Sequence, residues 1–185
     1  PTKAGLGGGS MNAASILKYF IKKKILNISK KKISEISRLI GSDVIFGLNP
    51  TNSILTSKNE VKYFKNIKNF YILIVKPDFG CSTKEIYSRV KKIHRTKFKQ
   101  PSKKMFELKF LKKTENQLES IVFSKYPKLE LIKSKLENIN NPLFVRMTGS
   151  GSALVAYYNS KKKCENAKKK FRKKYKNYWC ISSKT

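Results

Sequence analysis

Apolar residues recur along the chain at two spacings, one typical of helices and the other of strands. Recurrence every three or four residues predicts a helix over 10–24, with Ser10 near its start, and a second from the N-cap residue Ser29 to Gly41. The apolar stripe predicted for this second helix comprises Ile33, Ile36, Leu39 and Ile40. A short turn over 41–50 then leads to a strand or hairpin around 53–64.

The second half of the chain also contains both strand-like and helix-like patterns of apolar residues. "NFYILIVKP" at 69–77 predicts a buried strand stopped by Pro77, and a helix follows from Ser82 or Thr83. A polar, lysine-rich stretch over 96–114 is expected to be a mobile loop. Further helices are predicted over 115–138, with an interruption at Pro127, and over 161–176. Three more strands are predicted by "LFVRM", "ALVAYY" and "YWCISS". This mixture favours an α+β or mixed α/β fold over a helical bundle, with a linker near 60–69.

Composition narrows the class of protein. Hydrophobic residues make up 39% of the 185, enough for a core, but no run approaches the roughly 20 apolar residues of a membrane span. We see no secretory signal, so the cytoplasm is the expected location. Three scattered cysteines and one histidine indicate neither a zinc site nor a disulfide framework.

The net charge of +31 raises the question of a nucleic-acid partner. Only five of the 42 basic residues are arginine, although arginine is the residue favoured for bidentate recognition of bases and phosphates. The lysines are scattered over the whole chain. We therefore interpret the charge as a solvated surface that attracts polyanions non-specifically at low salt, and expect no specific nucleic-acid partner.

The opening stretch "PTKAGLGGGSMNAA" allows two interpretations. Gly7 to Ser10 could be a flexible linker before a start at Met11, or a glycine-rich loop that leads into a helix and binds phosphate. Bare backbone N–H groups and the helix dipole make the second arrangement attractive to anions. The loop is not a Walker A motif, because no Gly-Lys-Ser/Thr closes it.

Two later segments have a structural and a functional interpretation. Asp43, in "GSDVIF", is either a turn former or a carboxylate that accepts or orients a hydroxyl proton. The turn "TGSGS" over 148–152 is either a simple hairpin turn or a place where the backbone approaches an anion or a substrate.

Together, in this order and spacing, the three segments resemble the GHMP kinase superfamily. The first matches the family's Pro-x-x-x-Gly-Leu-Gly-Gly-Gly-Ser-x-Asn-Ala-Ala pattern, with Met11 where a small residue is usual. "GSDV" and "MTGSGSA" are similar to two further family segments, and "CSTKEIY" and "NQLESIVFSKYPKL" lie in family-like places. The resemblance extends over all 185 residues and favours a phosphate loop over a linker.

The resemblance implies a fold and a reaction. The fold is the α+β two-domain GHMP kinase architecture, with residues 1–65 the remainder of a ribosomal protein S5 domain 2-like, ATP-binding domain and 66–185 the C-terminal domain. The implied branch of the family transfers the γ-phosphoryl group of ATP to the 2-hydroxyl of 4-diphosphocytidyl-2-C-methyl-D-erythritol, with Mg²⁺, in non-mevalonate isoprenoid synthesis. Its partners are therefore ATP and a small-molecule substrate, with no membrane and no specific nucleic acid.

The resemblance also implies roles for individual residues. Asp43 is the expected catalytic base or orienting carboxylate, and Ser10 the expected contact at the phosphate–Mg²⁺ end. The turn over Gly149, Ser150 and Gly151 is expected on the substrate side. The ATP phosphates are expected at Lys3, Ala4, Gly5, Leu6, Gly7, Gly8, Gly9, Ser10 and Asn12.

Because the chain opens inside the family's ATP motif, we expect upstream kinase strands, with a family lysine and cytidine-binding side chains, to be missing. This chain alone is then expected to be inactive, with the faces of its first two helices uncovered. Two alternatives stay open: another GHMP kinase, of the mevalonate, homoserine or galactose type, and a basic nucleic-acid-binding module.

Overall fold

The computed structural model describes residues 1–56, 60–91 and 100–185, and these residues form two compact units. The larger unit contains residues 1–6, 68–91 and 104–185, and the smaller contains 7–56, 60–67 and 100–103. The predicted functional boundary between residues 65 and 66 stays a prediction. No helix of the described residues is both long enough and apolar enough to cross a membrane.

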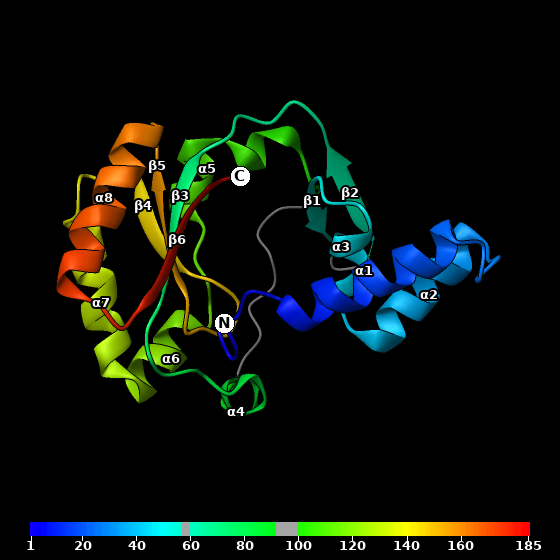
Figure 1. Cartoon of the computed structure of the whole chain (residues 1–185), viewed down its shortest axis with the longest axis horizontal. Helices are drawn as coiled ribbons and strands as arrows, with labels where there is room; N and C mark the ends of the chain where they lie inside the picture. The colour runs from blue at the N-terminus through cyan, green and yellow to red at the C-terminus, as the bar shows by residue number, and fades with distance from the viewer. Residues whose placement is uncertain (57–59, 92–99) are drawn as a thin grey trace. The chain divides into compact units, whose positions relative to one another are not determined.

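The larger unit is built on an antiparallel sheet of four strands in the order β4-β5-β3-β6 (Figure 1). The strands are β3 (Tyr71–Lys76), β4 (Phe144–Met147), β5 (Leu154–Tyr158) and β6 (Trp179–Lys184). Leu73 lies opposite Ala156, and Val75 opposite Leu154, and all four side chains are buried. Because side chains alternate along a strand, this register gives the sheet one continuous apolar face.

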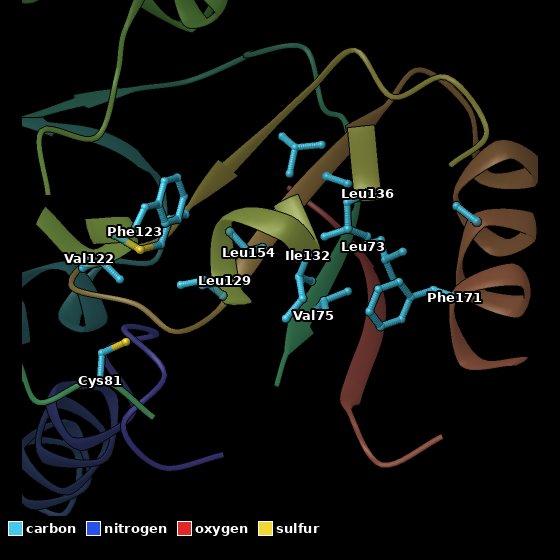
Figure 2. Packing of buried hydrophobic residues seen from close by; sticks show 14 of the residues in the cluster. Leu73, Val75, Cys81, Val122, Phe123, Leu129, Ile132, Leu136, Leu154 and Phe171 are labelled. Carbon is cyan, nitrogen blue, oxygen red and sulfur yellow. The ribbon is translucent and has the colours of Figure 1, made fainter. Parts of the chain in front are cut away.

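Helices α7 (Pro127–Glu137) and α8 (Lys161–Lys174) pack against this face (Figures 1 and 2). Their buried residues are spaced three or four apart and comprise Leu129, Ile132 and Leu136 of α7 and Cys164, Ala167 and Phe171 of α8. Helices on one side of an antiparallel sheet define an α+β fold, as predicted. The basic residues of α8 are on its exposed side, as expected for an amphipathic helix.

Shorter helices connect these elements. α4 (Thr83–Ser88) begins after Ser82, whose hydroxyl accepts the Glu85 N–H, so the predicted cap is confirmed. α6 (Glu119–Lys125) ends just before Pro127, the predicted interruption. The predicted loop over 96–114 is wrong in its described part, which contains a 3₁₀ turn (Lys103–Phe106) and α5 (Leu108–Lys113). Residues 96–99 of that prediction lie outside the described residues.

The smaller unit contains α1 (Gly8–Lys22), α2 (Lys30–Ile40), α3 (Val44–Leu48) and the antiparallel hairpin β1 (Asn52–Leu55) and β2 (Val61–Phe64). The hairpin and the Ser29 cap of α2 are confirmed. The turn predicted over 41–50 is wrong, because Val44–Leu48 form a helical turn.

α1 and α3 pack closely where Gly47 faces Ala14. A Cβ on Gly47 would lie 2.6 Å from the Cβ of Ala14, so only glycine permits this approach. This contact helps to explain why a sequence with weak helical preference forms α3.

The apolar stripe predicted for α2 is partly wrong. Leu39 is 87% exposed and Ile40 54% exposed, whereas Ser37 is fully buried. Ser37 fits there because its hydroxyl donates to the Ile33 carbonyl, 2.7 Å away. On α1, Ile16, Tyr19 and Phe20 are exposed as well. Among the described residues of this unit, nothing covers these side chains.

Candidate functional site

The first residues of the chain pair with the turn over 148–152, although more than 140 positions separate them. The Ser152 and Cys81 N–H groups donate to the Lys3 carbonyl, at 3.4 and 3.2 Å. The Ala153 N–H donates to the Ala4 carbonyl, at 3.0 Å. These bonds make residues 3–5 part of the larger unit, so the opening stretch is not a free linker.

Two glycines allow this close approach. Gly5 has a φ of +67°, and a Cβ there would lie 2.3 Å from the Thr148 carbonyl oxygen. Gly149 has a φ of +52°, and a Cβ there would lie 2.8 Å from the Gly5 carbonyl oxygen. Both the backbone conformation and the contact therefore require glycine. The Thr148 hydroxyl adds a hydrogen bond of 3.1 Å to the Gly5 carbonyl.

Hydroxyl groups hold the far side of the turn, two of them on buried serines and one on exposed Thr83. The Ser150 and Thr83 hydroxyls are 2.8 Å apart and share a hydrogen bond, and the Ser152 hydroxyl donates to the Phe79 carbonyl at 2.7 Å. Ser150, Gly151 and Ser152 are buried, whereas Gly149 is exposed. Of the three residues predicted on the substrate side, Gly149 is therefore the one that solvent reaches.

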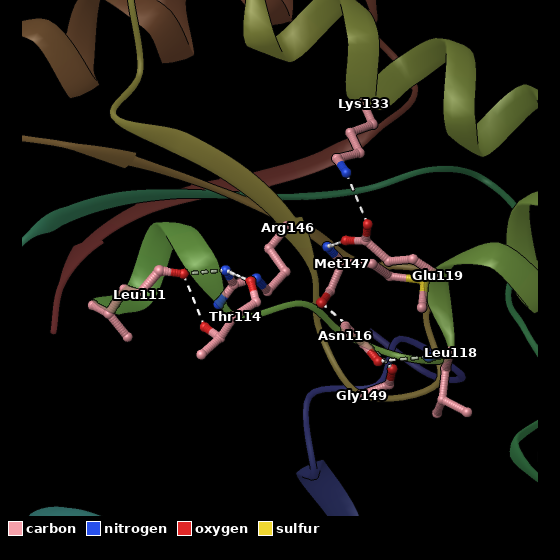
Figure 3. A network of polar contacts seen from close by, with 9 residues as sticks. All are labelled: Leu111, Thr114, Asn116, Leu118, Glu119, Lys133, Arg146, Met147 and Gly149. Atoms are coloured by element: carbon pink, nitrogen blue, oxygen red, sulfur yellow. Dashed lines mark hydrogen bonds and ion pairs between the residues drawn. The ribbon is translucent and has the colours of Figure 1, made fainter. Parts of the chain in front are cut away.

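Asn116, just before α6, and Glu119, the first residue of α6, hold the entry to the turn (Figure 3). The Asn116 amide donates to the carbonyls of Met147 and Gly149, and the Glu119 carboxylate accepts the Met147 N–H. The Arg146 guanidinium donates to the carbonyls of Leu111 and Thr114 at the end of α5.

In the smaller unit, the N-terminus of α1 is open. Gly7 is its N-cap residue, in a left-handed conformation, and Met11 makes the first intrahelical bond, to the Gly7 carbonyl at 2.9 Å. The helix thus begins two residues before the predicted start. A Cβ on Gly8 or Gly9 would meet nothing within 4 Å, and residues 8–11 include no acidic side chain. The N–H groups of a first helical turn lack intrahelical acceptors and carry partial positive charge.

Asp43 and Ser10 lie at this helix end. Oδ2 of Asp43 is 3.9 Å from the point where a Cβ on Gly7 would sit, and Oγ of Ser10 is 3.7 Å from the corresponding point on Gly41. Asp43 is exposed, and its side chain does not cap α3. The carboxylate is held by a 3.3 Å hydrogen bond from the Ser42 hydroxyl. The packing of α1 on α3 brings the residues just before α3 close to the N-terminus of α1.

The structure thus describes the predicted site residues in two groups. Lys3, Ala4, Gly5 and Leu6 lie with Gly149, Ser150 and Gly151 in the larger unit. Gly7, Gly8, Gly9, Ser10 and Asn12 lie with Asp43 in the smaller unit. Lys3 and Asn12 are exposed, whereas Ala4 is 4% exposed and contributes through its backbone.

Two thiols, those of Cys81 and Cys164, are buried. Burial raises the pKa of Cys81, beside the turn, although Lys125 and Lys76 oppose the shift. Burial and, secondarily, Glu165 raise the pKa of Cys164 to about 11. A protonated, buried thiol is a poor nucleophile and a poor metal ligand. Within the described residues, no cluster of three histidine, cysteine or acidic side chains could hold a metal by itself.

Sequence reasoning did not identify Asn116, Glu119, Thr148 or Thr83 as site residues. The signal for the first two was their place in "NQLESIVFSKYPKL", a segment that predicts a helix and lies in a family-like place but assigns no role to either side chain. Their partners are backbone groups about thirty residues away, and no local pattern encodes such contacts.

An α+β sheet domain with an N-terminal glycine loop and a late glycine turn is a combination that known proteins share. Residues 90–177 match the family described as GHMP kinases C terminal, and the chain belongs to the GHMP kinase family. It is 52% identical over 185 residues to the 4-diphosphocytidyl-2-C-methyl-D-erythritol kinase of Pelagibacter ubique. That alignment covers 100% of this chain and 66% of the relative, so the chain spans just under two thirds of the relative's length.

A more distant relative and two solved structures are also similar to this chain. The kinase of Clostridium tetani is 32% identical over 95% of this chain and 65% of its own length. A crystal structure of 4-(cytidine 5'-diphospho)-2C-methyl-D-erythritol kinase matches with a TM-score of 0.74 at 23% identity, over 98% of this chain and 67% of that one. Homoserine kinase from Cytophaga hutchinsonii matches with a TM-score of 0.62 at 13% identity, over 100% of this chain and 66% of that one. At these identities the two structures establish the shared fold.

Proposed function

We propose that this protein is a kinase that transfers the γ-phosphoryl group of ATP to the 2-hydroxyl of 4-diphosphocytidyl-2-C-methyl-D-erythritol, a step of non-mevalonate isoprenoid synthesis. The observation that carries the proposal is the 52% identity, along the entire chain, to a relative with that name. The local geometry supports it, because both glycine segments expose backbone where a phosphorylated ligand could approach.

The ATP phosphates bind, in this proposal, at the N-terminus of α1. The N–H groups of Gly8, Gly9 and Ser10 precede the first intrahelical bond, and a Cβ on Gly8 or Gly9 would meet none of the described residues within 4 Å. The helix dipole favours an anion there. Lys3 to Leu6 act by fixing the course of the loop that leads to Gly7, and the exposed Asn12 lies one helical turn further on.

Mg²⁺ fits the donors at this helix end. The ion prefers hard oxygen ligands and commonly binds through one or two carboxylates together with substrate phosphates. The Ser10 hydroxyl and the Asp43 carboxylate are side-chain oxygens near the α1 N-terminus. Ser10 would hold the ion with the phosphates. When bound, Mg²⁺ neutralises charge on the transferring phosphoryl group.

Asp43 is the proposed catalytic residue. Its carboxylate is exposed and lies near Gly7, at the positive end of α1. A carboxylate there can accept the proton of the acceptor hydroxyl or orient that hydroxyl toward the γ-phosphorus. The helix dipole attracts the carboxylate to this position.

The acceptor side is the proposed role of the turn over Gly149, Ser150 and Gly151. In the larger unit, exposed Gly149 borders a hollow of about 1140 Å³ that Arg89 and Lys91 also line. Cations at the rim suit an acceptor that carries a diphosphate. We place the enzyme in the cytoplasm, where its proposed cosubstrate ATP is available, and keep residues 1–65 and 66–185 as the functional domains.

ADP release tests the proposal. The protein, expressed from its complete coding region, should release ADP from Mg²⁺-ATP when 4-diphosphocytidyl-2-C-methyl-D-erythritol is present. Mevalonate, homoserine and galactose are the matched acceptors of other GHMP kinases. Release with one of these instead would reassign the substrate, and release with no acceptor of the panel would contradict the kinase proposal.

The charge of +31 favours a second candidate, a basic nucleic-acid-binding module. Its test is the salt dependence of RNA and DNA binding. Scattered lysines should lose most of their affinity for polyanions between about 50 and 200 mM salt. Tight binding that persists at the higher salt would favour the nucleic-acid function.

A further inference from the structure

The side-chain amide of Asn116 connects two backbone carbonyls of the glycine turn. Its Nδ2 donates to the Met147 oxygen at 3.0 Å and to the Gly149 oxygen at 2.7 Å (Figure 3). Its Oδ1 accepts the Leu118 N–H at 3.0 Å. Because carbonyl oxygens only accept and a backbone N–H only donates, one orientation of the amide satisfies all three bonds.

Glu119 fixes the next backbone group of the same strand end. One carboxylate oxygen accepts the Met147 N–H at 2.6 Å, and the other lies 2.8 Å from the Lys133 ammonium (Figure 3). The side chains of Glu119 and Lys133 are only 16% and 22% exposed, which strengthens a charge-assisted bond. Asn116 and Glu119 together thus hold three backbone groups between Met147 and Gly149.

Beyond this point the turn contacts the N-terminal loop directly. The Thr148 hydroxyl donates to the Gly5 carbonyl, and Gly149 is close enough to Gly5 that a Cβ would lie 2.8 Å from the same oxygen. A displacement of residues 148–149 must therefore displace Gly5. Gly5 is two residues before Gly7, the N-cap of α1.

We propose that Asn116 is a positioning residue for the phosphate loop, acting through Thr148 and Gly149 on Gly5. Glu119 and its ion pair with Lys133 support the same strand end. The inference rests on the proposed kinase function, because it assigns Asn116 to the binding of ATP. Asn116 also lines the hollow beside exposed Gly149.

The variant Asn116→Asp isolates the amide donor. It keeps an oxygen to accept the Leu118 N–H, but it places a carboxylate against two carbonyl oxygens. Asn138→Asp is the matched control, since the Asn138 amide also donates to a carbonyl, that of Ser134 at 2.8 Å, but on the exposed end of α7. Asn116→Ala is the second variant, in case the added charge prevents folding.

The kinetic constants separate positioning from folding. We expect Asn116→Asp and Asn116→Ala to raise the KM for ATP about tenfold, because a displaced loop weakens phosphate contacts. The KM for the acceptor should rise as well, since Asn116 and Gly149 line the hollow proposed for it. A purely structural role lowers apparent kcat through the folded fraction and leaves both KM values unchanged. Hydrogen exchange should also quicken at the Gly151 and Ala153 amides, whose bonds belong to the turn.

The positioning role would be overturned if the parent turns over normally and either Asn116 variant has the same KM for ATP as Asn138→Asp. An unchanged exchange rate at Gly151 and Ala153 would overturn it as well. An inactive parent protein is a different result, because it contradicts the proposed kinase function itself. The activity of the parent protein therefore distinguishes a failure of the positioning role from a failure of the kinase proposal.

Discussion

The hydroxyl of Thr148 donates a hydrogen bond to the carbonyl of Gly5, which lies 143 positions earlier in the chain. Two glycines with positive φ allow the segments to approach this closely. The glycines of the N-terminal motif therefore divide into two kinds. Gly5 is required by the packing of the backbone, whereas a Cβ on Gly8 or Gly9 would meet none of the described residues within 4 Å.

Gly5→Ala should destabilise the protein severely. A positive φ costs a residue with a Cβ roughly 1–2 kcal/mol, and a Cβ 2.3 Å from the Thr148 oxygen forces the turn to move as well. The midpoint of urea unfolding should fall accordingly. An unfolding midpoint equal to that of the parent would show that the loop does not pack as described.

Gly9→Ala should have the opposite effect on stability. It is exposed, lies in the first turn of α1 and has nothing within 4 Å of a Cβ, so alanine should stabilise the helix by up to about 1 kcal/mol. The KM for ATP should nevertheless rise, because the new methyl group stands where the phosphates approach. A more stable variant with an unchanged KM would remove Gly9 from the phosphate site.

Asp43→Asn should reduce kcat by about 10²-fold or more, the loss expected when a general base is removed. Stability should stay within about 0.5 kcal/mol, because the side chain is exposed and does not cap α3. Asp78→Asn is the control, since this exposed carboxylate pairs only loosely with Lys128, at 3.8 Å. Turnover of Asp43→Asn close to that of Asp78→Asn would exclude Asp43 from the mechanism.

Stability should fall in alkaline solution partly because of Cys164. Its pKa is about 11 in the folded chain and 9.0 as an ordinary thiol, so between these pH values the unfolded chain loses a proton that the folded chain keeps. The stabilisation is complete below pH 9 and is lost as the pH rises toward 11. Cys164→Ala should flatten this part of the curve of unfolding free energy against pH. An identical slope in parent and variant would contradict the assignment.

Much of the fold could be predicted because its signals are local. Ser29 and Ser82 cap helices through bonds to residues three positions later, and Pro127 separates two helices by its own geometry. α3 could not be predicted, since Val44–Leu48 prefer other conformations and depend on the Gly47–Ala14 contact with α1. Leu39 looked like a core residue because periodicity gives the face of a helix but not what covers it.

The candidate site, too, could be predicted only where its signals are local. The glycine motif, Asp43 and the late turn carry recognisable patterns, and the structure shows local contacts for each of them. Asn116 could not be identified from the sequence, because its partners at Met147 and Gly149 are backbone atoms and any residue type supplies those. Ser150 was predicted on the substrate side, but it is buried and its hydroxyl shares a hydrogen bond with that of Thr83.

The most direct test of the kinase proposal is the product itself, followed by ³¹P NMR. The protein from its complete coding region is incubated with Mg²⁺-ATP and 4-diphosphocytidyl-2-C-methyl-D-erythritol, and the spectrum is recorded over time. The account predicts a new phosphomonoester signal without vicinal P–H splitting, because the 2-carbon carries no hydrogen, and this signal grows as the γ-phosphate signal of ATP declines. Consumption of ATP without that signal, or no consumption by the folded protein, would contradict it.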